Sequence, residues 1–169
     1  MKSEILIVLS ILFALAPATP TTPNNTQNIS EIISSLPQDN NGVLYLGNDG
    51  VLRSVDASGR VVAYQQLSPD QIREYNSKFP AAEQDRLSRD FQGVDGRDVT
   101  NLDQLLNPDR NLLPPMTTTT TVSQQQPTST NVPGRNTCGN VGCTSQRECR
   151  QNGCNNCLQA DHMAMGYCH

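Results

Sequence analysis

The position of the cysteines constrains this chain of 169 residues more than any other feature. All six lie in the last 32 residues, and the preceding 137 residues contain none. Their spacing is C-x4-C-x5-C-x4-C-x2-C-x10-C. So dense a cluster is typical either of a disulfide framework or of a metal site, and the compartment in which the chain folds decides between them. The cysteines are Cys138, Cys143, Cys149, Cys154, Cys157 and Cys168.

The N-terminus has the pattern of a secretory signal peptide. Lys2 supplies a positive charge, an apolar segment covers residues 5–16, and residues 16–18 (Ala-Pro-Ala) suit a cleavage site. The apolar segment is shorter than the ~20 residues of a membrane-spanning helix, and no later segment is a better candidate. We therefore expect a secreted, extracellular protein without a membrane span.

An oxidising compartment favours three disulfides over zinc thiolates. The zinc alternative depends on the pair Cys154-x-x-Cys157 and on the two histidines, His162 and His169. Structural zinc sites usually contain two such closely spaced ligand pairs, and here there is one. We predict disulfides, and neither a metal nor a cofactor. The residues alone leave the connectivity of the six cysteines open.

The composition changes along the chain and predicts five segments. A Thr/Pro/Gln-rich stretch without charge, residues 112–133, is expected to be a disordered linker, which holds the cysteine module apart from a small folded unit. The predicted segments are a signal peptide (1–18), a flexible N-terminal segment with a short helix (19–39), a small α+β unit (40–107), a low-complexity linker (108–135) and a six-cysteine disulfide module (136–169).

The α+β unit has the clearest local signals. Apolar segments separated by Asp-Gly and Ser-Gly turns predict a three-stranded antiparallel meander over residues 43–67. Ser68 and Gln71 predict a helical capping box, and Pro80 ends that helix. Further helical segments extend to residue 107, which gives an α+β unit. Its aromatic residues are predicted to lie in the core: Tyr45, Tyr64, Tyr75, Phe79 and Phe91.

Neither charge nor motifs indicate nucleic-acid binding or catalysis. The net charge is −4 and no basic cluster occurs, so an electrostatic surface for phosphates is not predicted. The sequence contains no recognised nucleophile elbow, metalloprotease motif or nucleotide-binding loop. We expect no enzyme and no catalytic residue.

Two features predict exposed sites, one for glycosylation and one for contact with a partner. Sequons at Asn24 and Asn28 predict N-glycosylation. The longest interval between cysteines contains residues 158–167, which we predict to be an exposed loop and a candidate contact with a partner. The candidate contact residues are Asp161, His162, Met163, Met165 and Tyr167.

The cysteine spacing resembles that of the knottins, and most closely that of the plant metallocarboxypeptidase inhibitors, which show C-x3-C-x5-C-x5-C-x2-C-x6-C. This resemblance implies a knottin-like module. Those inhibitors act through a C-terminal tail that enters the protease, whereas here only His169 follows the last cysteine. The pairing that the resemblance implies is Cys138–Cys154, Cys143–Cys157 and Cys149–Cys168.

The whole arrangement is also similar to fungal small secreted cysteine-rich proteins. The likeness rests on the signal peptide, the segment of residues 49–54, the Thr/Ser-rich linker and the late Gly166-Tyr167-Cys168. It implies a secreted, non-enzymatic interaction protein, of the effector or virulence-associated kind, with an unidentified extracellular partner for which a host is one source. The alternatives are a carboxypeptidase-type protease inhibitor and a cell-wall-associated glycoprotein.

Overall fold

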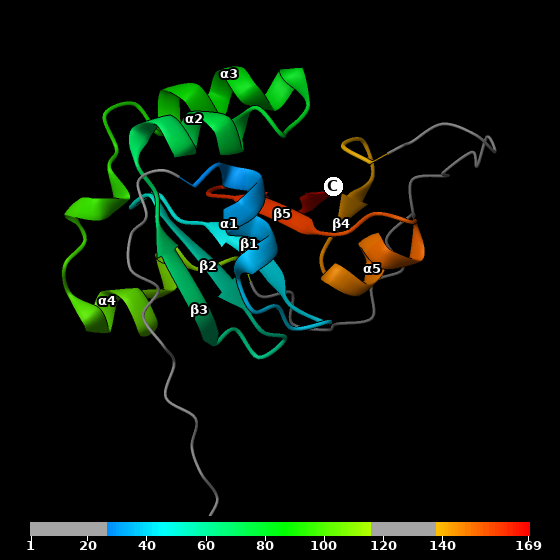
Figure 1. Cartoon of the computed structure of the whole chain (residues 1–169), viewed down its shortest axis with the longest axis horizontal. Coiled ribbons are helices and arrows are strands. Elements are labelled where there is room, and N and C mark those ends of the chain that lie inside the picture. The colour runs from blue at the N-terminus through cyan, green and yellow to red at the C-terminus, as the bar shows by residue number, and fades with distance from the viewer. Residues whose placement is uncertain (1–26, 116–137) are drawn as a thin grey trace, which may run out of the picture.

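The computed structural model describes residues 27–115 and 138–169. The predicted signal peptide, the sequon at Asn24 and most of the predicted linker lie outside the described residues. The described part is a mixed α+β structure built on one six-stranded sheet, with strand order β3-β2-β1-β5-β6-β4 (Figure 1). The strands are β1 (Val43–Leu46), β2 (Val51–Val55), β3 (Val61–Gln66), β4 (Gly142–Cys143), β5 (Cys157–Ala160) and β6 (Gly166–Cys168).

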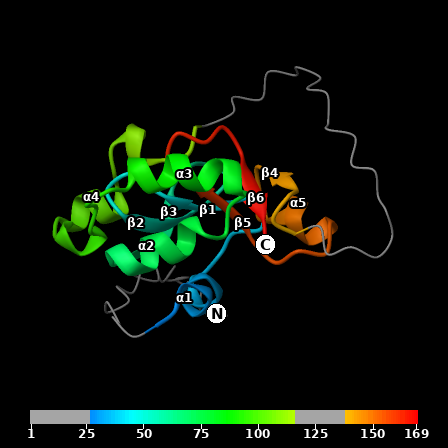
Figure 2. The same cartoon turned by 90° about the horizontal axis from the view of Figure 1, so that it is seen from above.

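Short helices surround this sheet. Helices α4 and α5 lie at opposite ends of the molecule, near β3 and β4 respectively (Figures 1 and 2). Among the described helices, none has the length and apolar character that crossing a membrane requires. The helices are α1 (Ile29–Ser35), α2 (Pro69–Asn76), α3 (Ala81–Asp90), α4 (Leu102–Leu106) and α5 (Gln146–Gln151), with 3-10 turns η1 (Gly96–Asp98) and η2 (Arg110–Leu112).

The predicted meander is confirmed. Strand β2 pairs antiparallel with both β1 and β3, through the two predicted turns. Gly50 and Gly59 end those turns with φ of +75° and +81°, a conformation that glycine adopts without a steric penalty. A side chain at Gly50 would also collide with the neighbouring backbone, because its Cβ would lie only 2.7 Å from the N atom of Gly96. Local turn chemistry therefore sets this half of the sheet.

The separation of the cysteine module from the α+β unit was predicted wrongly. Strand β5 of the module runs parallel to β1, with Leu44 opposite Leu158 and Leu46 opposite Ala160. The meander is thus half of a larger mixed sheet, to which the module adds β5, β6 and β4. A parallel pair between segments more than 100 residues apart leaves no local turn signal, so sequence patterns did not reveal it.

One face of the sheet carries the main apolar core, beneath α1, α2 and α3. Both parts of the chain contribute, because Leu158, Ala160 and Met163 pack with the side chains of the N-terminal helices and strands. All five aromatic residues predicted for the core are buried, between 0% and 8% exposed. The core is therefore common to the two regions that sequence patterns separated.

The predicted helix signals are confirmed in their main features. Ser68 and Gln71 form the reciprocal capping box at the start of α2, and Pro80 separates α2 from α3. Asn101 caps α4, because its side chain accepts the hydrogen bond from the backbone N–H of Asp103.

Candidate functional site

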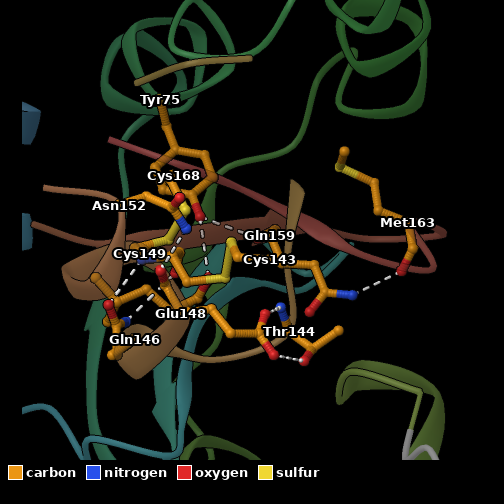
Figure 3. Close-up of a disulfide and its surroundings, with 12 residues drawn as sticks. Tyr75, Cys143, Thr144, Gln146, Glu148, Cys149, Asn152, Gln159, Met163 and Cys168 are labelled. Atoms are coloured by element: carbon orange, nitrogen blue, oxygen red, sulfur yellow. Dashed lines mark hydrogen bonds between the residues drawn. A yellow bond between two sulfur atoms is a disulfide. The ribbon is translucent and has the colours of Figure 1, made fainter. Parts of the chain in front are cut away.

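The C-terminal region is held by three disulfides, and Figure 3 shows the surroundings of one of them. The predicted disulfide bonding is confirmed, and the pairing is the one that the resemblance to the inhibitors implies. All six sulfur atoms are paired in these bonds, so none is left as a thiolate for the zinc alternative. The pairs are Cys138–Cys154, Cys143–Cys157 and Cys149–Cys168.

The disulfides pack against the second face of the sheet. Five of the six cysteines are buried in one cluster with Val43, Tyr45 and Val55 of the N-terminal strands. Leu113, from the segment after α4, packs against the same cluster. The cysteines therefore share one apolar cluster with residues of β1 and β2, in addition to joining segments of the module itself.

A buried amide ties α5 to β5. Gln146 is 1% exposed, and its side chain accepts a hydrogen bond from the backbone N–H of Cys157 while donating to the carbonyl of the same residue. Glu148 accepts hydrogen bonds from the backbone N–H and hydroxyl of Thr144, just before α5 (Figure 3). These bonds fix the orientation of a helix that is too short to be stable alone.

Tyr75 of α2 connects the helical layer to the junction of the two regions. Its hydroxyl donates to the carbonyl of Gln159 at 2.9 Å and lies 3.3 Å from the carbonyl of Leu44. These carbonyls belong to the paired strands β5 and β1. Burial raises the pKa of the Tyr75 hydroxyl, which keeps it a hydrogen-bond donor.

The predicted ten-residue loop is shorter than expected, because its ends form β5 and β6 and only residues 161–165 connect them. Asp161 and Met163 are buried, at 3% and 6% exposure, so their side chains are not available to a partner on the surface. Tyr167 packs against the core and meets Phe79 edge-on.

Two of the predicted contact residues remain exposed. The side chain of His162 is 70% exposed, and Met165 is 43% exposed. His162 has a φ of 61°, a left-handed conformation that is uncommon outside glycine. A contact through this loop stays a prediction for His162 and Met165.

Asp161 forms part of a buried polar contact that sequence patterns did not indicate. The hydroxyl of Tyr45 donates to Asp161 Oδ1 at 2.9 Å. Burial, together with the hydrogen bond to Asp161 and its negative charge, raises the pKa of Tyr45. Within residues 27–115 and 138–169, Asp161 Oδ2 accepts no hydrogen bond, and His162 Nε2 lies 3.0 Å away as an ionic partner when protonated. The contact attaches the β5–β6 connection to β1.

A second buried charge lies under α4. Arg53 is 0% exposed and forms two parallel hydrogen bonds with Asp49, of 2.9 and 2.7 Å. Its Nη2 also donates to the carbonyl of Gln104. The alternation of side chains along β2 is the sequence signal for the burial of Arg53, because Arg53 lies on the same face of the strand as Val51 and Val55. Asp49, in the turn before β2, therefore has a structural role as the counter-charge of Arg53.

Two hollows lie where the regions meet. One, of 440 Å³, is lined by Asn40 and Asn41 before β1 and by three residues of α5. The other, of 280 Å³, includes Asn41, the ends of β1 and β2, Pro114–Pro115 and residues of the module. Both combine residues from the two regions. We call them together the junction surface; the α5 residues of the first hollow are Arg147, Arg150 and Gln151.

Asn28, the described sequon, is exposed and caps α1. Its side-chain oxygen accepts a hydrogen bond from the backbone N–H of Glu31. The hydroxyl of Ser30, the third residue of the sequon, accepts a hydrogen bond from Lys78. The exposure of Asn28 is compatible with the predicted glycosylation, which stays a prediction.

Comparison with known proteins identifies a relative. The chain is 34% identical over 123 residues to the Lactobacillus up-regulated protein of Emericella nidulans, and the match covers 71% of this chain and 70% of the relative. No protein-family model matches the chain, and no solved structure matches it. By its identity and coverage, the chain belongs to the family of the Lactobacillus up-regulated protein.

Proposed function

We propose that this protein is a secreted, non-enzymatic binding protein that acts outside the cell, of the fungal effector or virulence-associated kind. The observation that carries the proposal is the position of the disulfides. Five of the six cysteines are buried in one cluster with residues of β1 and β2, so the disulfides are part of the apolar packing that both regions share. Disulfides of this kind form and persist in oxidising compartments, in agreement with the predicted signal peptide.

The junction surface supports a binding role. It is an open surface with exposed side chains from two parts of the chain, held together by the sheet. Neither His162 nor His169 has a hydrogen bond to a hydroxyl nucleophile in the described part of the chain, which supports binding over acyl-transfer chemistry.

Inhibition of carboxypeptidases through a C-terminal tail has less support. The carbonyl of His169 accepts hydrogen bonds from the backbone N–H groups of Asn155 and Asn156, and its own N–H donates to Asn156 at 2.8 Å. These bonds hold His169 against the module, so this residue does not project toward a protease cleft.

The name of the relative suggests where to look for a partner. It refers to up-regulation and to Lactobacillus and states no ligand or activity, so Lactobacillus cells serve as one capture surface beside host extracellular fluid. The proposal for this chain is an extracellular binding protein with an unidentified target.

A secretion and capture experiment tests the proposal. The full chain with its own N-terminus is expressed in a fungal host, and we expect the oxidised protein in the medium. The purified protein is then incubated with washed Lactobacillus cells and, separately, with host extracellular fluid. We expect saturable retention by at least one of them, which the reduced and alkylated protein does not show. Retention of the protein inside the producing cells, or no saturable binding to either, would overturn the proposal.

A further inference from the structure

The first hollow of the junction surface is lined by residues with polar or charged side chains. All five residues that line its 440 Å³ have polar side chains and are exposed. Two are arginines on α5, and three are amides that can both donate and accept hydrogen bonds. None of these lining residues is aromatic or aliphatic. The five residues are Asn40, Asn41, Arg147, Arg150 and Gln151.

Within the part of the chain that the structure describes, the two arginines provide positive charge without a carboxylate partner. Among the ion pairs of the described residues, none includes Arg147 or Arg150. The carboxylates nearest in sequence are engaged elsewhere: Glu148 accepts from Thr144, and Asp39 accepts from the N–H of Asn41. On a chain of net charge −4, this pair is available to an external anion.

The walls of the hollow are held in place by hydrogen bonds between the two regions. The backbone N–H groups of Gln146 and Arg147 donate to the carbonyls of Gly42 and Asn40, each at 2.8 Å. The guanidinium of Arg150 donates to the side-chain oxygen of Asn40. A preformed arrangement loses less conformational entropy when a ligand binds.

We propose that this hollow binds an acidic saccharide, with the guanidinium groups on its carboxylate or phosphate and the amides on its hydroxyl groups. Arginine pairs planar anionic groups through two parallel hydrogen bonds, and side-chain amides match neighbouring hydroxyls. A nucleotide would need a surface on which its base could stack, and this lining has none. The inference rests on the proposed extracellular function and names the ligand class for its junction surface.

The anionic group has two extracellular sources, uronate polymers with carboxylates and phosphorylated mannans with phosphates. The test titrates the oxidised full-length protein with oligogalacturonate and, separately, with a phosphomannan oligosaccharide, and uses a neutral maltooligosaccharide as the control ligand. Calorimetry or fluorescence anisotropy measures the dissociation constant. We expect one or both acidic ligands to bind, the neutral ligand not to bind, and the stronger acidic ligand to identify the source.

A matched pair of double variants tests the location. Arg147→Gln/Arg150→Gln removes both charges from the hollow, and we expect the affinity to fall at least about 10-fold, since hydrogen bonds to charged groups are among the stronger polar contacts. Arg89→Gln/Arg110→Gln removes the same charge from exposed arginines outside the hollow and should change affinity less than about 2-fold. Thermal melts and thiol counts check that both variants stay folded and oxidised.

Two results would overturn the inference. One is the absence of binding by either acidic ligand to the folded wild-type protein at low salt. The other is an equal loss of affinity in both double variants, which would mean general attraction by net charge. If cell or fluid capture persists in the Arg147→Gln/Arg150→Gln variant, this inference fails and the proposed binding function stands. If neither cells nor fluid capture the protein while the acidic ligands bind, the proposed binding function fails and this inference stands.

Discussion

Residues 27–115 and residues 138–169 reach stability by different means. The first region contains no cysteine and is held by a meander, capped helices and an apolar core. The second is much shorter and holds three disulfides across sequence separations of 14 to 19 residues. A chain of this length cannot bury enough apolar surface alone, so crosslinks replace part of the core.

The comparison also shows that neither region is complete. Strand β1 would be a sheet edge without β5, and exposed edges promote wrong pairing. Leu158 of β5 is 0% exposed only because helices and strands of the first region cover it. The two regions are therefore expected to unfold as one unit, and the following experiments test this.

Reduction of the disulfides should have the largest effect. Loss of one native disulfide in a small secreted protein costs about 2–5 kcal/mol, and three are present. We expect reduced and alkylated protein to lose protection of the β1 and β2 amides, although those strands contain no cysteine. Hydrogen exchange followed by mass spectrometry measures this.

The control for reduction is oxidised protein treated with the same alkylating reagent. Because it has no free thiol, its exchange pattern should not change. Full protection of β1 and β2 in the reduced protein would show that the first region folds independently.

Within the first region, the buried ion pair should matter most. Asp49→Asn leaves the fully buried Arg53 without its counter-charge, which we expect to lower the free energy of unfolding by about 3–5 kcal/mol. Asp70→Asn is the matched control, since its pair with Arg73 is 83% and 72% exposed and should be worth less than about 1 kcal/mol. Urea denaturation of both variants measures the free energy of unfolding. Equal losses in the two variants would contradict a structural role for the pair of Asp49 and Arg53.

Substitutions in the second region should differ in effect according to whether the side chain lies in the core that both regions share. Leu158→Ala in the second region should cost about 2–5 kcal/mol and lower the stability of both regions together. Met165→Ala, at a side chain 43% exposed in the same region, should change stability by less than about 0.5 kcal/mol. Hydrogen exchange measures this. If Leu158→Ala lowers the exchange protection of the amides in β5 and β6 while the amides of β1 to β3 keep theirs, the two regions do not unfold as one unit.

The smallest expected effect concerns pH and the second meander turn. Burial alone would raise the pKa of Asp56, but hydrogen bonds from Ser58 and Arg60 outweigh it and lower the pKa from 3.8 to about 2. The folded-state pKa is depressed, so the contribution to stability is present above about pH 4 and is lost as the pH falls through about 2.

Asp56→Asn should therefore flatten the dependence of the melting temperature on pH in this range. Asp85→Asn, at an exposed carboxylate, is the control and should keep the wild-type slope. Thermal melts between about pH 5 and about pH 2 compare the three proteins. If the melting temperature of wild type and of Asp56→Asn depends on pH with the same slope, Asp56 does not contribute to the acid sensitivity of stability.

Local patterns predicted those parts of the fold whose partners lie nearby in sequence. The turns at Gly50 and Gly59, the capping box of Ser68 and Gln71 and the break at Pro80 each depend on a few consecutive residues. The candidate contact loop was predicted only in part. Its pattern predicts surface positions throughout, whereas Asp161 and Met163 are turned inward by contacts with distant strands.

By itself the sequence determined the meander, the capped helices, the aromatic core positions and the use of the cysteines in disulfides. Only the tertiary structure decided that the cysteine module completes the sheet of the first region. The parallel pairing of β1 with β5 joins Leu44 to Leu158. Such pairing depends on mutual burial of side chains across a long stretch of chain, and no short-range periodicity records it. For the same reason, the junction surface could be found only once the sheet had been assembled.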